Sequence, residues 1–351
     1  MKCVKRTLLV LSSLILAAAI AATALYWNEL RTLMTMKKVD GHPLFTMAYS
    51  GDYGFTDFLA LGAQSDRDIE KYVTGRLLKG LPIDLGISSA GCSAFTAINT
   101  KCQRIFARNF DFDYAPALLM ETSPPDGYRS VSVVNLAFAG YGEGNLPDTS
   151  LVNRFLTLAG PYLPFDGMNE KGVVVALLAV PHAEPPMKEG RVTLNTTTAI
   201  RLILDRAASV QEAINLLSGY NLYFSGGVEC HYLIADAAGD SAIVEFLDGE
   251  IKITRTDKRH QTVTNFIVYE GRNEGEGGDE FERYDTIEQK LDSLGSVIGE
   301  EDAMALLGDA RIPGRTQWSV VYNQTTGEAR IAMGGIYDNV YRFRLTLSNE
   351  T

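Results

Sequence analysis

The stretch that decides the fold reads GCSAFTAIN at residues 91–99 and, after a short turn, RIFARNFDFD at residues 104–113. Apolar and small polar residues alternate through 93–98, which is the pattern of a half-buried β-strand. Residues 99–101, Asn-Thr-Lys, favour a turn, and the second stretch then resumes extended structure. The sequence therefore predicts a β-hairpin with Cys92 at its open end.

Three chemically active side chains are predicted to meet at that open end. Arg108 and Asp111 lie on the returning strand, where the hairpin would bring both beside Cys92. A guanidinium near a thiol favours the thiolate, and a carboxylate can hold a protonated amine in place. This combination predicts that Cys92 is a nucleophile. Taken alone, Cys92 would also suit a buried structural thiol or a disulfide with Cys102 or Cys230, and whether those two cysteines pair stays open.

A base for this thiol is not obvious among the imidazoles. The chain has four histidines: His42, His182, His231 and His260. None of them has a spacing that pairs it with Cys92. The remaining candidate is the α-amino group that cutting the Gly91–Cys92 bond would create, because its reference pKa of about 7.7–8.0 lets it accept the thiol proton near neutral pH. One residue would then be nucleophile and base, and Gly91, without a side chain, would leave the carbonyl ahead of it open to attack.

These residues resemble a known superfamily. Gly91-Cys92 followed by RNFDF at 108–112 is similar to the choloylglycine hydrolase and N-acylethanolamine acid amidase superfamily, the N-terminal-nucleophile linear amide C–N hydrolases that include bile salt hydrolases and penicillin V acylases. The resemblance covers roughly residues 91–345. Its further segments are DGMNEKG at 166–172 with the apolar run 173–181, the strand patterns at 231–246, Thr264-Asn265, and Arg283-Tyr284.

The resemblance implies an α+β fold, the four-layer αββα sandwich, and a set of site residues. The implied catalytic residues are Cys92, Arg108, Asp111, Asn265 and Arg283. Ala179 and Asn169 are implied to support the oxyanion, although Asn169 would equally suit a turn at the entry to a strand. Superfamily members tend to carry asparagine or tyrosine where this chain has Ala179, so only a backbone N–H could donate there. No cofactor is implied, and no group of histidine, cysteine and carboxylate residues has the spacing of a metal site.

Strand and helix patterns continue beyond the hairpin. Strands recur from residue 130 to residue 347, and helices are predicted at 197–207, 209–217, 283–294 and 302–307. Runs of strands separated by helix pairs indicate an α+β arrangement without help from the resemblance. Because no linker rich in proline, glycine or serine divides this region, residues 92–351 are predicted to form one N-terminal-nucleophile amidohydrolase domain.

The residues ahead of the hairpin carry a different signal. Residues 7–27 form a nearly continuous apolar run behind Lys2, Lys5 and Arg6, which is long enough to span a bilayer with the N-terminus in the cytoplasm. A cleaved signal peptide is the rival interpretation, because Ala22-Thr23-Ala24 offers a small-x-small cleavage site. The catalytic domain is therefore expected outside the cytoplasm, either held at the cell membrane by a single helix or secreted. Residues 28–91 are predicted to be a propeptide-like segment with one helix at 66–79.

Charge and composition limit the partners. The chain has 351 residues, a net charge of −11 and four cysteines. Such an acidic chain argues against nucleic acid as a partner, since phosphate contacts need a basic surface. So few cysteines in a chain of this length do not form a disulfide framework. The expected partners are a small-molecule N-acyl amide and, through the N-terminal helix, a membrane; a homo-oligomer stays open.

The function predicted from these observations is an exported amidase. It would hydrolyse a linear, non-peptide C–N amide through a cysteine freed by autoproteolysis at Gly91–Cys92. The substrate stays open among N-acyl amines, conjugated bile salts and amides of the penicillin V type. Two alternatives remain: an acyltransferase of the same fold, in which an amine replaces water as acceptor, and a non-catalytic, membrane-anchored binding protein.

Overall fold

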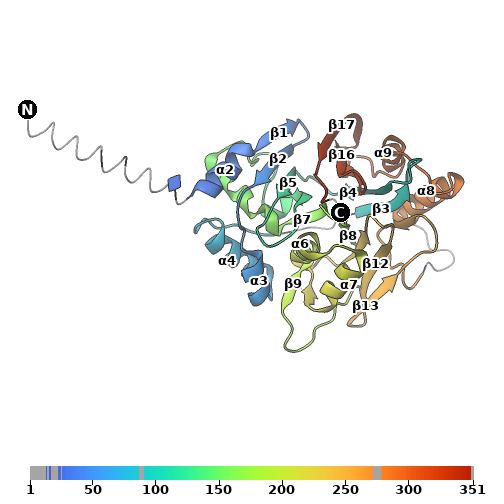
Figure 1. Cartoon of the computed structure of the whole chain (residues 1–351), viewed down its shortest axis with the longest axis horizontal. Helices are drawn as coiled ribbons and strands as arrows, with labels where there is room; N and C mark the ends of the chain where they lie inside the picture. Colours follow the sequence, from blue (N-terminus) through green and yellow to red (C-terminus); the bar gives the residue numbers. More distant parts are fainter. Residues whose placement is uncertain are drawn as a thin grey trace, which may run out of the picture.

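Two large β-sheets lie face to face in the computed structural model, which describes residues 13, 16, 23–24, 26–86, 91–271 and 278–348 (Figure 1). The nine-stranded sheet has the order β1 (Lys37–Asp40), β2 (Leu44–Tyr49), β5 (Ala117–Thr122), β6 (Ser130–Asn135), β7 (Pro164–Asn169), β8 (Val174–Ala179), β11 (Cys230–Ala235), β12 (Ser241–Leu247) and β13 (Glu250–Thr254). The six-stranded sheet has the order β14 (Gln261–Val263), β3 (Gly91–Ile98), β4 (Arg104–Asp111), β15 (Thr316–Asn323), β16 (Glu328–Met333) and β17 (Ile336–Arg344). A short parallel pair, β9 (Thr193–Asn195) and β10 (Asn221–Tyr223), lies apart from both.

Helices cover the outer face of each sheet. On the nine-stranded sheet, α6 (Thr196–Arg206) packs on β7 and β8, and α7 (Val210–Ser218) packs on β11 and β12. On the six-stranded sheet, α8 (Asp279–Ser293) packs on β3 and β14, and α9 (Glu300–Asp309) packs on β4 and β15. Strands β3 and β8 meet between the sheets. The predicted four-layer αββα sandwich is confirmed.

The hairpin predicted from the opening stretch is formed by β3 and β4. Cys92 pairs with Phe110 and Ala94 pairs with Arg108, so these side chains share the face that looks into the space between the sheets. The opposite face of the hairpin is also buried, because Phe95 and its neighbours pack beneath α8 and α9. The predicted half-buried strand is therefore wrong in one respect: both faces of β3 are covered.

The residues ahead of the hairpin are part of the sheet architecture. Between residues 26 and 86, which the structure describes, they contain three helices, α2 (Trp27–Thr35), α3 (Phe55–Leu61) and α4 (Asp66–Arg76), together with β1 and β2. Strand β2 pairs in parallel with β5 along its whole length and so extends the nine-stranded sheet. The predicted helix at 66–79 is present as α4, but the prediction of a single helix in this segment is wrong.

The other predicted helices are present with shifted ends. Helices α6 and α7 match the predictions within one residue, whereas α8 begins four residues before the predicted 283 and α9 extends the predicted 302–307 at both ends. Most of the predicted membrane-spanning run at 7–27 lies outside the described residues. None of the described helices has both the length and the apolar character that crossing a membrane requires.

Candidate active site

Cys92 lies at the start of β3, fully buried between the sheets. Its thiol lies 3.1 Å from Nη2 of Arg108, which donates to it. Its backbone N–H donates to Oδ1 of Asn265 at 2.7 Å, and its carbonyl accepts from Nη1 of Arg283 at 2.5 Å. Three of the residues implied by the resemblance therefore contact three different groups of Cys92.

Arg108 is held in one orientation by an ion pair, a backbone carbonyl and two aromatic rings. Its Nη1 forms a fully buried ion pair with Asp166 at 2.7 Å and also donates to the carbonyl of Phe165 at 3.1 Å. The guanidinium lies over the rings of Phe110 and Trp318, with centroids 5.2 and 5.9 Å away. Because a guanidinium presents its donors in a rigid fork, fixing Nη1 on Asp166 also fixes Nη2 on the thiol.

Burial has the largest effect on the pKa of the thiol in the uncut chain. It raises the pKa of Cys92 above its ordinary value of 9.0. Arg108 and the backbone of Ala179 act in the opposite direction, and Asp111 adds to the rise. Arg108 thus favours the thiolate, as expected, but in the uncut chain the removal of the thiol from water outweighs the nearby positive charge.

Asp111 ends β4 directly opposite Gly91. Its Oδ1 accepts from the hydroxyl of Thr316 at 2.5 Å, while its Oδ2 lies 3.7 Å from Arg283 and makes no hydrogen bond within the described residues. Burial raises the pKa of this carboxyl group, against smaller opposing effects of Thr316, Arg283 and Arg108. A Cβ at position 91 would lie 3.3 Å from the Cβ of Asp111, so glycine lets β3 and β4 approach closely at the predicted cleavage site.

Asn265 and Ala179 lie on the other side of Cys92. Nδ2 of Asn265 donates to the carbonyl of Ala179 at 2.7 Å, and Oδ1 accepts from Nη2 of Arg283 at 2.9 Å as well as from Cys92. An amide nitrogen carries two protons, so the second N–H of Asn265 stays available to a substrate oxygen. The structure thus brings Cys92, Arg108, Asp111, Ala179, Asn265 and Arg283 together around Gly91.

Asn169 is not part of this cluster. Its Nδ2 donates to the carbonyls of Leu204 and Ala207, and its Oδ1 accepts from the N–H groups of Lys171 and Val173. Asn169 also pairs with Val173, at the end of β8 opposite to Ala179, which is about 20 Å away at about 3.3 Å per residue. The implied oxyanion role is therefore wrong, and the side chain instead fixes a turn and the end of α6.

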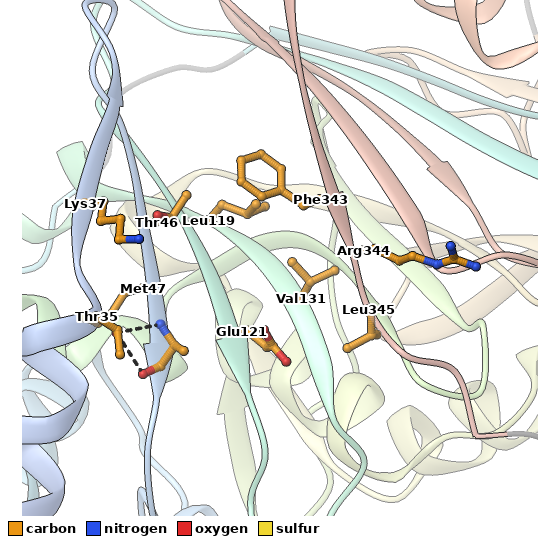
Figure 2. Close-up of a pocket in the computed structure, with 11 residues that line it drawn as sticks. Thr35, Lys37, Thr46, Met47, Leu119, Glu121, Val131, Phe343, Arg344 and Leu345 are labelled. Carbon is orange, nitrogen blue, oxygen red and sulfur yellow. Dashed lines mark hydrogen bonds between the residues drawn. The ribbon is translucent and has the colours of Figure 1, made fainter.

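Two cavities adjoin the cluster. One, of about 400 Å³, is lined by Ala179, Val180, Pro181, Gly227, Val228, Glu229 and Asn265. The other, of about 20 Å³, is apolar and shares Ala179 and Val228 with the first. Glu229 is the one charged side chain in the larger lining, and its Oε2 accepts from the N–H of Ala183 at 2.9 Å. A pocket shown in Figure 2, between β2, β5 and the end of β17, shares no residue with this cluster.

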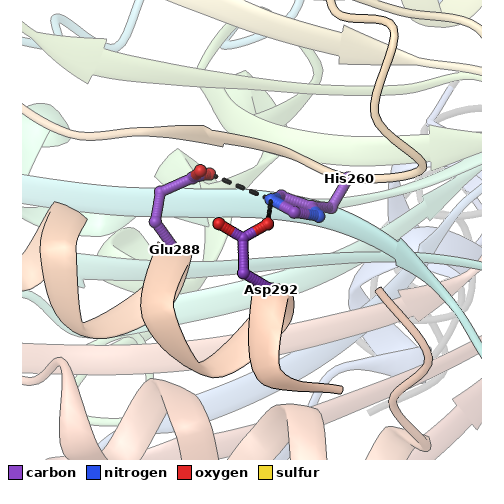
Figure 3. Close-up of side chains that lie close together, drawn as sticks. All are labelled: His260, Glu288 and Asp292. Atoms are coloured by element: carbon purple, nitrogen blue, oxygen red, sulfur yellow. Dashed lines mark ion pairs between the residues drawn. The ribbon is translucent and has the colours of Figure 1, made fainter. Parts of the chain in front are cut away.

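His260, Glu288 and Asp292 are brought together although their spacing in the sequence gave no metal signal (Figure 3). The last two project from α8 toward the ring of His260, whose Nε2 lies 3.2 Å from Oε1 of Glu288. The ammonium of Lys258 already contacts both carboxylates, at 2.9 and 3.0 Å. The ammonium thus balances one of the two negative charges and occupies the space between the carboxylates, so the group is better described as an ion-pair network than as a metal site.

The cysteines are free wherever the structure describes them: Cys92 and Cys230 are buried, and Cys102 is exposed in the hairpin turn. Sequence reasoning missed Asp166, Trp318, Tyr322 and Thr316. The Trp318 indole and the Tyr322 hydroxyl donate to Asp166 at 3.2 and 2.5 Å, and together with Arg108 they give that carboxylate three donors. The one available signal was a carboxylate directly after the apolar residues Leu163-Pro164-Phe165.

Comparisons with known proteins agree with this architecture. The four-layer αββα fold is that of the N-terminal-nucleophile hydrolases. Residues 154–350 match the family described as acyl-coenzyme A:6-aminopenicillanic acid acyl-transferase, and the chain belongs to this family. The predicted superfamily, which includes bile salt hydrolases and penicillin V acylases, is thereby confirmed.

Individual relatives support the same assignment. A penicillin V acylase of Pectobacterium atrosepticum is 30% identical over 116 residues, which make up 30% of this chain and 31% of that protein. A mutant conjugated bile acid hydrolase from Clostridium perfringens superposes with a TM-score of 0.51 and 14% identity, covering 74% of this chain and 93% of the other. The penicillin V acylase of Agrobacterium tumefaciens gives a TM-score of 0.51 and 19% identity, covering 74% of this chain and 89% of the other. At these identities the two structures establish the fold.

Proposed function

We propose that this chain is an amidase that cuts its own Gly91–Cys92 bond and then hydrolyses a linear, non-peptide C–N amide with Cys92 as nucleophile. The observation that carries the proposal is the set of contacts around that one peptide bond. Arg108 contacts the thiol, Asn265 accepts from the nitrogen, and the Oδ2 of Asp111 faces Gly91 with no hydrogen bond to a described residue.

Maturation would begin with attack of the Cys92 sulfur on the Gly91 carbonyl. The C–N bond breaks, the nitrogen takes the thiol proton, and the Gly91 acyl group passes to sulfur as a thioester. Water then hydrolyses the thioester and leaves a free α-amine on Cys92. Oδ1 of Asn265 already accepts from this nitrogen, and the carboxylate of Asp111 lies next to the bond and can hold the resulting ammonium.

Turnover would reuse the same groups. The free amine accepts the thiol proton, the sulfur attacks the substrate carbonyl, and the amine returns the proton to the departing nitrogen. In this proposal the spare N–H of Asn265 and the backbone N–H of Ala179 stabilise the oxyanion. A donor of this kind is typically worth about 2.7–4 kcal/mol of the barrier. Water then releases the acyl group from sulfur.

In this proposal the substrate binds in the cavity beside Ala179 and Asn265. Its lining is largely apolar, which suits an N-acyl group or a hydrophobic amine. Glu229 disfavours an anionic group at the same place. We therefore favour neutral or cationic N-acyl amines over conjugates that carry a carboxylate or sulfonate.

The test compares the wild type with two variants by intact mass and by hydrolysis of N-acyl amides that differ in acyl length and head group. Cys92→Ala should remain at full length and be inactive, whereas Cys230→Ala, the control at the other buried thiol, should mature and turn over. If Cys92→Ala matures normally, a separate protease makes the cut and the self-processing proposal fails. If it hydrolyses amides at the wild-type rate, Cys92 is not the nucleophile.

An acyltransferase is the second candidate, because the matching family is described by such an activity. The two enzymes share an acyl-thioester and differ in what accepts the acyl group. Adding hydroxylamine or a primary amine to the reaction and measuring the ratio of amide to free acid separates them. A hydrolase gives mainly acid at millimolar amine, whereas a transferase gives mainly the new amide.

A further inference from the structure

A buried histidine and carboxylate lie directly behind Asn265 and have no part in the mechanism above. His231 is on β11 and Glu245 is on the neighbouring strand β12, and neither side chain is exposed. Nδ1 of His231 lies 3.0 Å from Oε1 of Glu245. The two therefore form a closed pair within the nine-stranded sheet, on the side toward the segment that carries Asn265.

The pair holds that segment at three points. Nε2 of His231 lies 3.1 Å from the carbonyl oxygen of Thr264, and the two carboxylate oxygens of Glu245 accept from the N–H groups of Val268 and Tyr269, each at 2.7 Å. The Thr264 carbonyl belongs to the same planar peptide unit as the nitrogen of Asn265. Fixing this carbonyl therefore fixes the plane from which the Asn265 side chain reaches Cys92.

The hydrogen-bond geometry also indicates how many protons the ring of His231 carries. Both ring nitrogens of His231 face oxygens, one a carbonyl and the other a carboxylate that already accepts two N–H groups. A neutral imidazole has one N–H and would leave the lone pair of its other nitrogen against an oxygen, whereas the imidazolium donates from both. Two backbone donors on a carboxylate favour its charged form, so the shared proton belongs on the ring.

We propose that His231 is an imidazolium paired with Glu245, and that this buried ion pair is a positioning element for Asn265. A buried ion pair is a weak source of stability, since the loss of hydration offsets most of the attraction. Its location, one peptide unit from a residue that contacts Cys92, gives it a different use. It ties the nine-stranded sheet to the site residue that contacts the nucleophile on the six-stranded sheet.

The protonation state is tested first, on the full-length Cys92→Ala variant, by long-range ¹H–¹⁵N correlation of the histidine rings near neutral pH. The resonance of His231 is assigned by its loss in His231→Gln. Two protonated ring nitrogens are expected. A spectrum with one protonated and one bare nitrogen on His231 overturns the proposal. This measurement does not depend on any activity of the enzyme.

The positioning role is tested with two matched variants, and this part rests on the proposed function. In His231→Gln the side-chain amide nitrogen takes the place of Nε2 and can still donate to Thr264, whereas in His231→Asn it takes the place of Nδ1 and can donate only to Glu245. Both lose the charge. Since a displacement of about 1 Å can cost about 100-fold in rate, His231→Asn should lower kcat by about that factor with KM little changed, and His231→Gln should retain most of the activity.

Equal kcat values for the two variants would overturn the positioning role, as would a larger loss in His231→Gln. If either variant fails to fold, Glu245→Gln, which leaves the Thr264 contact in place, supplies the comparison through the same kcat and KM measurements. A wild-type enzyme that is inactive on every amide would refute the proposed function and leave the nitrogen spectrum of His231 unchanged. The two failures are therefore distinguishable.

Discussion

The ion pair between Arg108 and Asp166 offers the sharpest energetic test of the site. Both side chains are fully buried and their atoms lie 2.7 Å apart. At that distance and an effective dielectric constant of about 20, two unit charges attract by roughly 6 kcal/mol before the loss of hydration is counted. Removing one partner of such a pair typically costs about 3–5 kcal/mol, because the other charge stays buried without compensation. Arg108→Met should therefore destabilise the folded chain by about 3–5 kcal/mol.

The double variant Arg108→Met/Asp166→Asn should be less damaging than its parts suggest. Methionine has a comparable length and can stay packed on Phe110 and Trp318, and the amide that replaces the carboxylate leaves no buried charge. The two single effects should exceed the double effect by a coupling energy of about 0.5–3 kcal/mol. Urea unfolding of all four proteins in a Cys92→Ala background, where each stays uncut, measures this coupling.

Acidification gives an internal control for the same experiment. Burial raises the pKa of Asp166, and Arg108 is the largest opposing influence, so Arg108→Met should raise that pKa further. A group whose pKa is raised on folding favours the folded state below its unfolded pKa and disfavours it as pH rises. The deficit of Arg108→Met should therefore shrink as pH falls, and that of the double variant should not. Additive single effects, or a deficit independent of pH, would refute this reasoning.

Three further perturbations test separate parts of the structure. Asn169→Ala should cost about 1–3 kcal/mol in urea unfolding, because it leaves buried backbone groups unsatisfied, and kcat should stay unchanged; a selective loss of kcat would restore its oxyanion role. Burial alone would raise the pKa of Glu288, but the neighbouring side chains of His260, Lys258 and Thr262 lower it to about 2. The stability this provides is present above pH 4.5, the ordinary value, and is lost as pH falls toward 2. The melting temperature of Glu288→Gln should therefore depend less on pH over that range than that of the wild type, and an equal dependence would contradict the network. Glu229→Gln should raise kcat/KM for anionic N-acyl amines relative to neutral ones by up to about fivefold, and an unchanged ratio would mean that substrates do not approach this carboxylate.

The hairpin and the site residues that it carries were predictable because the sequence pattern that determines them is local. Alternation through 93–98 sets the strand, and the turn at 99–101 sets the register that places Arg108 and Asp111 near Cys92. Burial of the second hairpin face was not predictable in this way. It depends on α8 and α9, which follow in the sequence more than 150 residues later.

The ion pair beneath Cys92 could not be predicted from the sequence for the same reason. Asp166 is on β7 in one sheet and Arg108 is on β4 in the other, so their pairing is a result of how the sheets stack. Asn169 was misassigned because it lies in a segment that resembles the superfamily, while its own side chain serves the turn beside it. The parallel pairing of β2 with β5 likewise joins segments separated by the whole hairpin.

Intact mass of the catalytically active protein tests the central claim most directly. The account predicts two associated chains, the second of which begins at Cys92 and carries a free α-amine, with amide hydrolysis confined to that species. Active enzyme in which the bond between Gly91 and Cys92 is unbroken would contradict it.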